Sequence, residues 1–264
     1  MGVYNAQNEP AFYDSIHSIL TQTVKEFEFI ICDDGSTDDT YNMLATIAST
    51  DKRILLIKNE RNSGLAAALN QCILLASSDI LIRQDIDDWS QNNRFELLLS
   101  AFQKKPTLAF IGSHCKLYRH NGIFGEMRYP EFPKNEDFLF GVPFTHGAVA
   151  MKRSAVLAVG GYQVSKSTRR TEDYELFMRF YANGFLGGNL QQSIYHYKED
   201  ASSKRKHLYR YRVDEALVRA KGFYSLGLLP KGIPYIIKPL IVGLIPQKLL
   251  SKLKDKYDNR RENY

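Results

Sequence analysis

Between residues 27 and 112 the sequence alternates short apolar runs with amphipathic stretches, and no other feature constrains the fold as strongly. The apolar runs have the length of buried strands, and the stretches between them carry apolar residues at helical spacing. This alternation predicts an α/β fold with a mainly parallel central sheet flanked by helices. The predicted strands are 27–32, 53–58, 79–83 and 108–112, and the predicted helices are 10–23, 64–76, 94–103 and 172–183.

Other parts of the chain are less regular. We expect a further helix to begin at Ser36 as its N-cap, with Asp39 as the capping-box partner. Residues 114–150 are interrupted by prolines and show no clear period. A parallel sheet also needs an apolar strand before its first helix, and only Met1 to Tyr4 are present there. We therefore expect the sequence to begin within the last residues of its first strand.

Composition indicates an ordinary globular chain, with 44% apolar and 24% charged residues among 264. That balance excludes collagen-like, disordered and disulfide-scaffold classes. The three widely spaced cysteines Cys32, Cys72 and Cys115 suggest reduced thiols of a cytoplasmic protein, and their spacing suggests no metal site.

The positive charge is concentrated at one end. Residues 1–200 hold 20 basic against 24 acidic side chains, whereas residues 201–264 hold 15 against 5. A basic tail favours a polyanionic surface, either lipid headgroups or nucleic acid. The most apolar part of the tail, Pro234 to Pro246, is shorter than the ~20 residues of a membrane-spanning helix, so we expect membrane contact only at the surface.

Two acidic loops follow predicted strands, where ligands of parallel sheets bind. In Asp33-Asp34-Gly35-Ser36, a carboxylate could accept a hydrogen bond from the imide N–H of a nucleobase, or the residues could serve only as turn and cap. Asp85-Ile86-Asp87-Asp88 concentrates negative charge that Mg²⁺ or Mn²⁺ would neutralise; the alternative is a solvated acidic loop.

Two further features suggest chemistry in the second half of the chain. Glu172-Asp173 opens a predicted helix, so its charge either favours the helix N-terminus or supplies a general base for a hydroxyl group. His146 is either a ligand contact or a structural histidine.

Taken together, these motifs resemble glycosyltransferase family 2. The resemblance covers about residues 1–200 and rests on motifs in matching order. They are Val3-Tyr4-Asn5, residues 18–23, residues 27–38 with the Asp33-Asp34-Gly35-Ser36 loop, residues 59–66, Asp85-Ile86-Asp87-Asp88 with Arg94-Phe95, Gly160-Gly161-Tyr162, and Glu172-Asp173-Tyr174.

The resemblance implies a GT-A fold, which is Rossmann-like, with a nucleotide-sugar-binding half (1–100) and an acceptor half (101–200). Residues 201–264 would form a basic helical extension. It further implies an inverting enzyme that uses a divalent metal and transfers sugar from a nucleotide-diphosphate sugar, most simply a UDP-sugar. The acceptor would be a glycan or a lipid-linked glycan of a surface polysaccharide such as capsule or lipopolysaccharide.

The implied roles follow position by position. The nucleotide-binding set would be Val3, Tyr4, Asn5, Asp34, Asn62, Gly64 and Asp85; Asp87 would hold the metal; Asp173 would be the catalytic base beside Glu172; and His146 and Asp88 would contact donor or acceptor. Where relatives often carry Tyr-Arg-x-His, this chain has Tyr195-His196-Tyr197-Lys198, and Lys198 could pair with phosphate instead.

Two other functions fit parts of the pattern. A non-catalytic nucleotide-sugar-binding protein would keep the pocket without turnover. A nucleotidyltransferase would need a glycine-rich, basic triphosphate loop near the amino terminus, which the sequence lacks. We expect no nucleic-acid partner, because Leu, Ile and Pro dominate the tail.

The tail itself allows two interpretations. Lys248, Lys252 and Lys256 lie beside a stripe of Leu249, Leu253 and Tyr257, which suits either a helix on anionic lipid or a helix packed on the core. We expect a cytoplasmic protein that can contact the inner face of the membrane.

Overall fold

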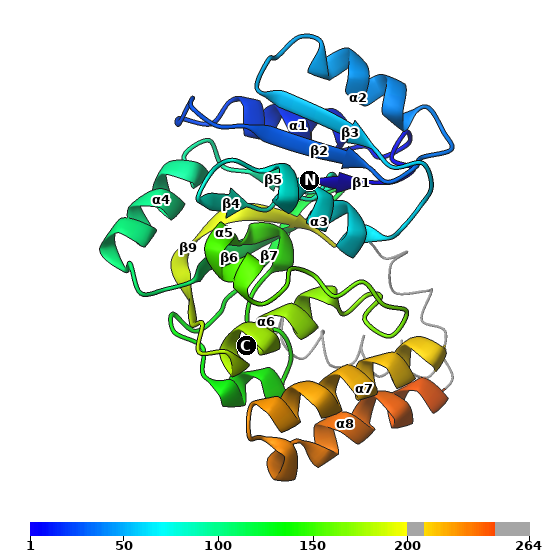
Figure 1. Ribbon diagram of the computed structural model, residues 1–264, viewed down its shortest axis with the longest axis vertical. Helices are drawn as coiled ribbons and strands as arrows, with labels where there is room; N and C mark the ends of the chain where they lie inside the picture. The colour runs from blue at the N-terminus through cyan, green and yellow to red at the C-terminus, as the bar shows by residue number, and fades with distance from the viewer. Residues whose placement is uncertain (200–208, 246–264) are drawn as a thin grey trace.

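The computed structural model describes residues 1–199 and 209–245, and its elements alternate as the sequence predicts (Figure 1). The strands are β1 (Gly2–Val3), β2 (Phe29–Asp33), β3 (Ile54–Lys58), β4 (Ile80–Ile82), β5 (Trp89–Ser90), β6 (Phe110–Arg119), β7 (Gly122–Met127), β8 (Ala150–Lys152) and β9 (Gly187–Lys198). The helices are α1 (Phe12–Leu20), α2 (Thr40–Ala48), α3 (Leu65–Leu75), α4 (Arg94–Lys104), α5 (Arg153–Ala158), α6 (Glu172–Ala182), α7 (Tyr209–Ser225) and α8 (Leu229–Leu244), with short 3₁₀ turns at Asn135–Leu139 and His146–Ala148.

The first sheet is wholly parallel, in the order β1-β2-β3. Its strand β2 is buried along its whole length, as expected for the middle strand of a sheet covered on both faces. Helix α1 forms because Phe12, Ile16 and Ile19 recur at helical spacing and bury one face against this sheet. The expected short first strand is present as β1, which pairs with Cys32 and Asp33.

The second sheet is mixed, in the order β4-β8-β6-β9-β5, with β7 added to the side of β6. Its β6–β9 pair is parallel, and its other pairs are antiparallel. Phe110 on β6 is fully buried, and its ring packs about 5 Å from those of Phe144, Phe177 and Phe180. These aromatic contacts join β6 to α6 and build the core of the second half. The expected α/β fold with helices on a central sheet is confirmed.

Two local predictions were wrong. Helix α2 begins at Thr40 with Asp39 as its N-cap, and no side-chain capping bond forms there. Ser36 instead accepts a hydrogen bond from the Asn5 N–H, so it joins two loops rather than capping a helix. Residues 114–150, expected to be less regular, contain the β6–β7 hairpin, in which Arg119 pairs with Gly122 across a turn at residues 120 and 121.

The carboxyl-terminal helices share the core of the second half. Val218 and Phe223 on α7 are buried in the same apolar cluster as Phe177 on α6. Figure 1 shows α7 and α8 side by side beneath α6. Of the described helices, none is long and apolar enough to cross a bilayer. The predicted stripe at residues 248–257 lies outside the described residues.

The close packing of two loops on Gly35 yields a testable expectation. Gly35 has φ +69°, and a side chain there would meet the backbone of Arg61 at 2.5 Å. Gly184 has φ +78° but open space around it, so it isolates the cost of the backbone conformation. We expect Gly184→Ala to lower the free energy of unfolding by about 1 kcal/mol, and Gly35→Ala by about 3 kcal/mol, because only Gly35→Ala adds a backbone clash. Equal losses in urea unfolding of the two variants would contradict the packing described here.

Candidate active site

The loops that follow β1 and β2 are fastened together at one edge of the first sheet. Asn5, in a left-handed conformation (φ 48°), accepts a hydrogen bond from the Thr37 N–H at 2.9 Å. Ala6 N–H donates to the Thr40 hydroxyl at 2.7 Å. The Tyr4 side chain remains 45% exposed beside this junction and is free to stack on a ligand, whereas Val3 is buried in the core.

Asp34 organises the loop before α3. Its carboxylate accepts hydrogen bonds from Asn59 Nδ2 at 2.8 Å and from the backbone N–H groups of Ser63 and Gly64 at 3.0 and 2.7 Å. The residue is 2% exposed, so in this conformation its carboxylate holds the loop. Asn62, between these contacts, is exposed. The structure therefore brings together Asp34, Asn62 and Gly64, three residues of the predicted nucleotide-binding set, with Asp34 at the centre.

The acidic loop after β4 carries carboxylates with opposite titration behaviour. Burial opposes ionisation of Asp85, but the guanidinium of Arg83, whose Nη2 lies 2.7 Å from Asp85 Oδ1, holds the Asp85 pKa below its usual range. Burial and the charge of Asp85 raise the pKa of Asp87 to about 6. The loop thus concentrates negative charge that a bound cation would relieve.

A second buried arginine supports the loop from beneath. Arg94 on α4 is fully buried and donates from Nη1 to Gln84 Oε1 and Ser90 Oγ, at 3.1 and 2.8 Å. Its Nη2 donates to the carbonyls of Arg83 and Gly147, at 2.8 and 3.0 Å. These bonds join the acidic loop to the loop at Gly147 and fix both relative to α4.

Asp88 lies behind the loop instead of in the open site. It is 1% exposed, and its Oδ1 accepts a hydrogen bond from the Lys198 N–H at 2.7 Å. Burial together with Asp85 and Asp87 raises its pKa well above the usual range. Here the Asp88 carboxylate presents almost no surface to a donor or acceptor, unlike the contact expected from the sequence. The Lys198 ammonium forms an ion pair with Glu9 instead of remaining free.

Asp173 lies in the first turn of α6, close enough to Asp85 of the acidic loop for the two charges to interact. Burial is the main cause that raises its pKa to about 6, and the charges of Glu172 and Asp85 add to it. Its Oδ1 accepts the Tyr174 N–H at 2.8 Å, so the carboxylate is oriented by its own helix. A half-buried carboxylate with a pKa near neutrality has the properties of a general base.

His146 begins the short 3₁₀ turn before β8 and lies close to Arg83 and Asp85. Its Nε2 is 2.7 Å from the Tyr162 hydroxyl, and burial followed by the Arg83 charge lowers the His146 pKa to about 3. The imidazole is therefore neutral at physiological pH. Asp85 acts electrostatically on both His146 and Asp173, so the structure places the three in one site.

Whether this site suits a divalent metal depends on which side chains could serve as its ligands. Within residues 1–199 and 209–245, no three His, Cys, Asp or Glu side chains converge as a ready-made metal cage. One oxygen of Asp85 is taken by Arg83, which leaves Asp87 as the best protein ligand. One or two carboxylates completed by substrate phosphates are the usual donor set of Mg²⁺ in nucleotide sites, so the residues fit a metal that arrives with its ligand.

Several residues of this site were not found from the sequence. Arg83 and Gln84 were missed, and Arg94 was named in a motif but given no role, because the pattern does not show that their polar groups turn inward beneath a loop. Tyr195 was also missed: its hydroxyl accepts the Asp85 N–H at 3.3 Å. One signal in the sequence could have indicated the ion pair beneath the loop: Arg83 is a cation at the end of an apolar run, just before three carboxylates.

The sequence comparisons identify the family. The model of glycosyl transferase family 2 matches residues 1–160, so the chain belongs to this family. EpsE of Bacillus subtilis (strain 168), named as a glycosyltransferase, is 35% identical over 99% of this chain and 94% of its own length. The UDP-Gal:alpha-D-GlcNAc-diphosphoundecaprenol beta-1,3-galactosyltransferase of Escherichia coli is 30% identical over 81% of this chain and 78% of its own.

Solved structures share the fold. TarS (1–349) of S. aureus, crystallised with UDP-GlcNAc, superposes with a TM-score of 0.68 at 15% identity, covering 90% of this chain and 71% of that one. The mannosyltransferase PcManGT of Pyrobaculum calidifontis, in complex with GDP-Man and Mn²⁺, gives 0.60 at 14% identity, covering 97% and 79%. Both support the GT-A architecture expected above.

The raised pKa of Asp173 predicts how its replacement affects stability. Folding raises this pKa from 3.8 to about 6, so the native state binds the proton more tightly and loses stability as the pH rises through that window. We expect Asp173→Asn to increase the free energy of unfolding at pH 7 by about 1–2 kcal/mol, after allowance for partial solvent exposure. The gain should shrink to a few tenths of a kcal/mol (~0.2) at pH 3.5, where the wild-type carboxyl is mostly protonated in both states. Urea unfolding at pH 7 and at pH 3.5 measures this, and an equal gain at both pH values would contradict it.

Proposed function

We propose that this family 2 enzyme is an inverting glycosyltransferase of polysaccharide synthesis that transfers a sugar from a UDP-sugar to a lipid-linked acceptor. The observation that carries the proposal is a buried carboxylate, Asp173, close to a separate acidic loop. Asp173 has its pKa raised to about 6 and faces the acidic loop that holds Asp85 and Asp87. A base on one side and a cation-attracting loop on the other are what a displacement at a sugar diphosphate requires.

The nucleotide is proposed to bind at the edge of the first sheet. Tyr4 offers an exposed ring for stacking on the base. Asp34 lies in the same loop as the exposed Asn62, and its carboxylate is oriented by the Gly64 N–H. Asp85 would contact the ribose or the metal side of the diphosphate. The UDP-GlcNAc bound by TarS and the UDP-Gal in the name of the E. coli relative support uridine as the base.

A divalent cation is proposed to bind with the diphosphate, with Asp87 as its protein ligand. When bound, such an ion offsets the negative charge that develops on the leaving diphosphate. The Mn²⁺ in the PcManGT complex supports this for a protein of the same fold. His146, neutral and held by Tyr162, lies where it can orient the donor or acceptor without adding a charge.

The chemical step follows from the placement of Asp173. The acceptor hydroxyl attacks the anomeric carbon on the face opposite the diphosphate and forms the new C–O bond. The bond between that carbon and the diphosphate oxygen breaks, and the nucleoside diphosphate leaves with its electron pair. Asp173 takes the hydroxyl proton, with Glu172 as its neighbour. One in-line displacement inverts configuration, so an α-linked donor gives a β-linked product.

The lipid-linked acceptor and a location at the inner membrane face are proposed together. The name of the E. coli relative specifies a diphosphoundecaprenol acceptor. Helix α8 has no acidic residue, and its Ile233, Ile237 and Ile241 are 51%, 43% and 57% exposed in one stripe. Such a stripe beside basic side chains suits contact with an anionic membrane surface.

The role of Asp173 provides the test. We expect Asp173→Asn to lower the rate of sugar transfer by at least about 100-fold, because general-base catalysis contributes about 10²–10⁴-fold. The affinity for UDP, measured by calorimetry, should remain within about twofold. Glu172→Gln, one residue away, is the matched control and should retain most of the turnover. Full turnover in Asp173→Asn would exclude this residue as the base, and no turnover in the wild type with UDP bound would favour a non-catalytic binding protein.

A further inference from the structure

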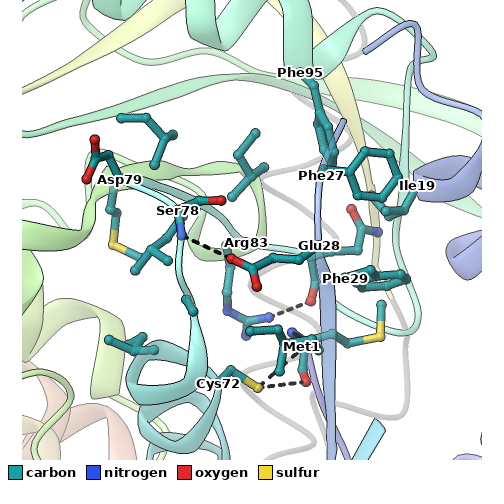
Figure 2. A pocket seen from close by; sticks show the side chains of 18 of the residues that line it. Met1, Ile19, Phe27, Glu28, Phe29, Cys72, Ser78, Asp79, Arg83 and Phe95 are labelled. Carbon is teal, nitrogen blue, oxygen red and sulfur yellow. Dashed lines mark hydrogen bonds between the residues drawn. The ribbon is translucent and has the colours of Figure 1, made fainter. Parts of the chain in front are cut away.

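The cationic side chains that support the acidic loop already have partners within the protein. Arg83 donates from Nη1 to a backbone carbonyl at 2.7 Å, the bond drawn beside it in Figure 2, and pairs with Asp85 through Nη2. Arg94 is fully buried, and the Lys198 ammonium pairs with Glu9. Binding a phosphate with these groups would break an ion pair or disturb a buried charge, so a second anionic group at this site needs other cations.

Three exposed arginines gather at the ring of Tyr211, in the first turn of α7. The guanidinium carbons of Arg170, from the loop before α6, and of Arg210 each lie 4.9 Å from the ring centroid. Arg210 also donates to the Tyr211 hydroxyl at 3.0 Å, and this bond, with the charges of Arg210, Arg170 and Arg169, lowers the Tyr211 pKa. In the described parts of the chain, no carboxylate forms an ion pair with any of the three, and Asp214 acts on Arg210 through its charge alone.

The packing of α6 on α7 brings these arginines to the candidate active site. Arg219 lies over the Tyr174 ring, and a side chain at Gly222 would meet Met178, so the two helices run parallel. In Figure 1 the yellow first turn of α7 lies at the same side as the loop that precedes α6. The arginines are therefore at the amino ends of both helices, where negative charge is favoured, and at the end of α6 that carries Asp173.

The loop before α6 holds Arg170 in a conformation that long side chains rarely adopt, with φ 71°. Thr168, buried in this loop, donates from its hydroxyl to Gln163 O at 2.8 Å, and its carbonyl accepts the Thr171 N–H at 2.9 Å. Such conformations persist where the surrounding structure holds them, and they are common at ligand sites. With this backbone, the Arg170 guanidinium reaches Tyr211 on a different helix.

We propose that Arg169, Arg170 and Arg210 bind a diphosphate that joins the acceptor sugar to its lipid. This inference rests on the proposed transfer to a lipid-linked acceptor and adds the part of the acceptor that the protein recognises. The Cα atoms of Arg170 and Asp173 are at most about 11 Å apart, because only three peptide units separate them. In such an acceptor the diphosphate is attached to the ring whose hydroxyl is attacked. Guanidinium groups match the geometry of phosphate oxygens, so the arginines can bind the diphosphate while Asp173 contacts the hydroxyl.

The test measures binding of citronellyl diphosphate, a short isoprenoid diphosphate without a sugar, by calorimetry in EDTA. Without metal, the proposed donor site lacks the cation that would hold a diphosphate there. We expect the wild type to bind this probe and Arg169→Gln/Arg170→Gln/Arg210→Gln to bind it at least about 10-fold more weakly, because charge-assisted hydrogen bonds are lost. The matched control, Lys221→Gln/Lys231→Gln/Lys238→Gln, removes the same charge from exposed positions of α7 and α8 and should bind within about twofold of the wild type.

Two further measurements separate this site from a lipid surface and from a folding defect. The arginine variant should bind vesicles of phosphatidylglycerol and phosphatidylcholine within about twofold of the wild type, since the proposed ligand is not a headgroup. Arg170→Gly should bind the diphosphate more weakly without a lower melting temperature, because glycine adopts this conformation without strain.

Several results would overturn the proposal. They are a wild type that does not bind the diphosphate, equal binding by the wild type and the arginine variant, equal losses in both triple variants, and a loss of vesicle binding as large as the loss of diphosphate binding. None of these measurements uses a sugar donor. A wild type that binds the diphosphate through these arginines but transfers no sugar would therefore contradict the proposed function alone.

Discussion

The arrangement of the site depends on two buried arginines beneath a loop of three carboxylates. Arg83 pairs with Asp85, and Arg94 binds the backbone and polar groups on which the loop rests. Without these cations, burying carboxylates so close together would be prohibitively costly. With them, Asp85 stays ionised while the pKa of Asp87 rises to about 6, so the loop remains folded and still attracts positive charge.

The two halves of the chain meet at this loop, and each half supplies a different kind of group. The half that contains the parallel sheet contributes loops joined to one another by the hydrogen bonds of Asn5 and Asp34. Loops held in this way suit a preformed nucleotide-binding site. The mixed half contributes Asp173 and His146, held by α6 and by Tyr162. The ion pair of Glu9 with Lys198 connects a loop of the first half to the end of β9. A substrate bound between the halves would therefore contact groups whose positions are set by separate cores.

The sequence predicted best those features that follow from local pattern. Helices 64–76, 94–103 and 172–183 were found within a residue or two because their apolar residues recur at helical spacing and tertiary packing agrees. The hairpin at residues 110–127 was missed because its outer strand is exposed and lacks alternation, although Asn121-Gly122 gave a turn signal. The long strand β9 was missed for a related reason: its polar middle does not read as a strand.

The site was predictable only in part. The motifs located Asp34, Asp85, Asp87 and Asp173 at strand ends and a helix start, and the fold brings the last three into one site. No pattern could show that Asp88 turns inward to bind the Lys198 N–H, since that depends on β9, which lies 110 positions further along the chain. The same limit applies to Arg94, whose partners come from the acidic loop, from β5 and from the turn at Gly147. A residue's role that depends on tertiary contacts can be assigned only from the structure, whereas a role set by local geometry can be predicted from the sequence.

We propose that the edge of the first sheet and the acidic loop together bind a nucleoside diphosphate with a divalent metal. Thermal melting with UDP, GDP, dTDP and CMP, each with and without Mn²⁺, tests it directly in the wild type and in Asp87→Asn. A ligand at 100 times its dissociation constant stabilises a fold by about 2.7 kcal/mol, or roughly 5–10 °C here. We expect a shift of that size for UDP in the wild type that requires Mn²⁺ and is lost in Asp87→Asn. No shift with any nucleotide, or a shift unaffected by Asp87→Asn, would contradict it.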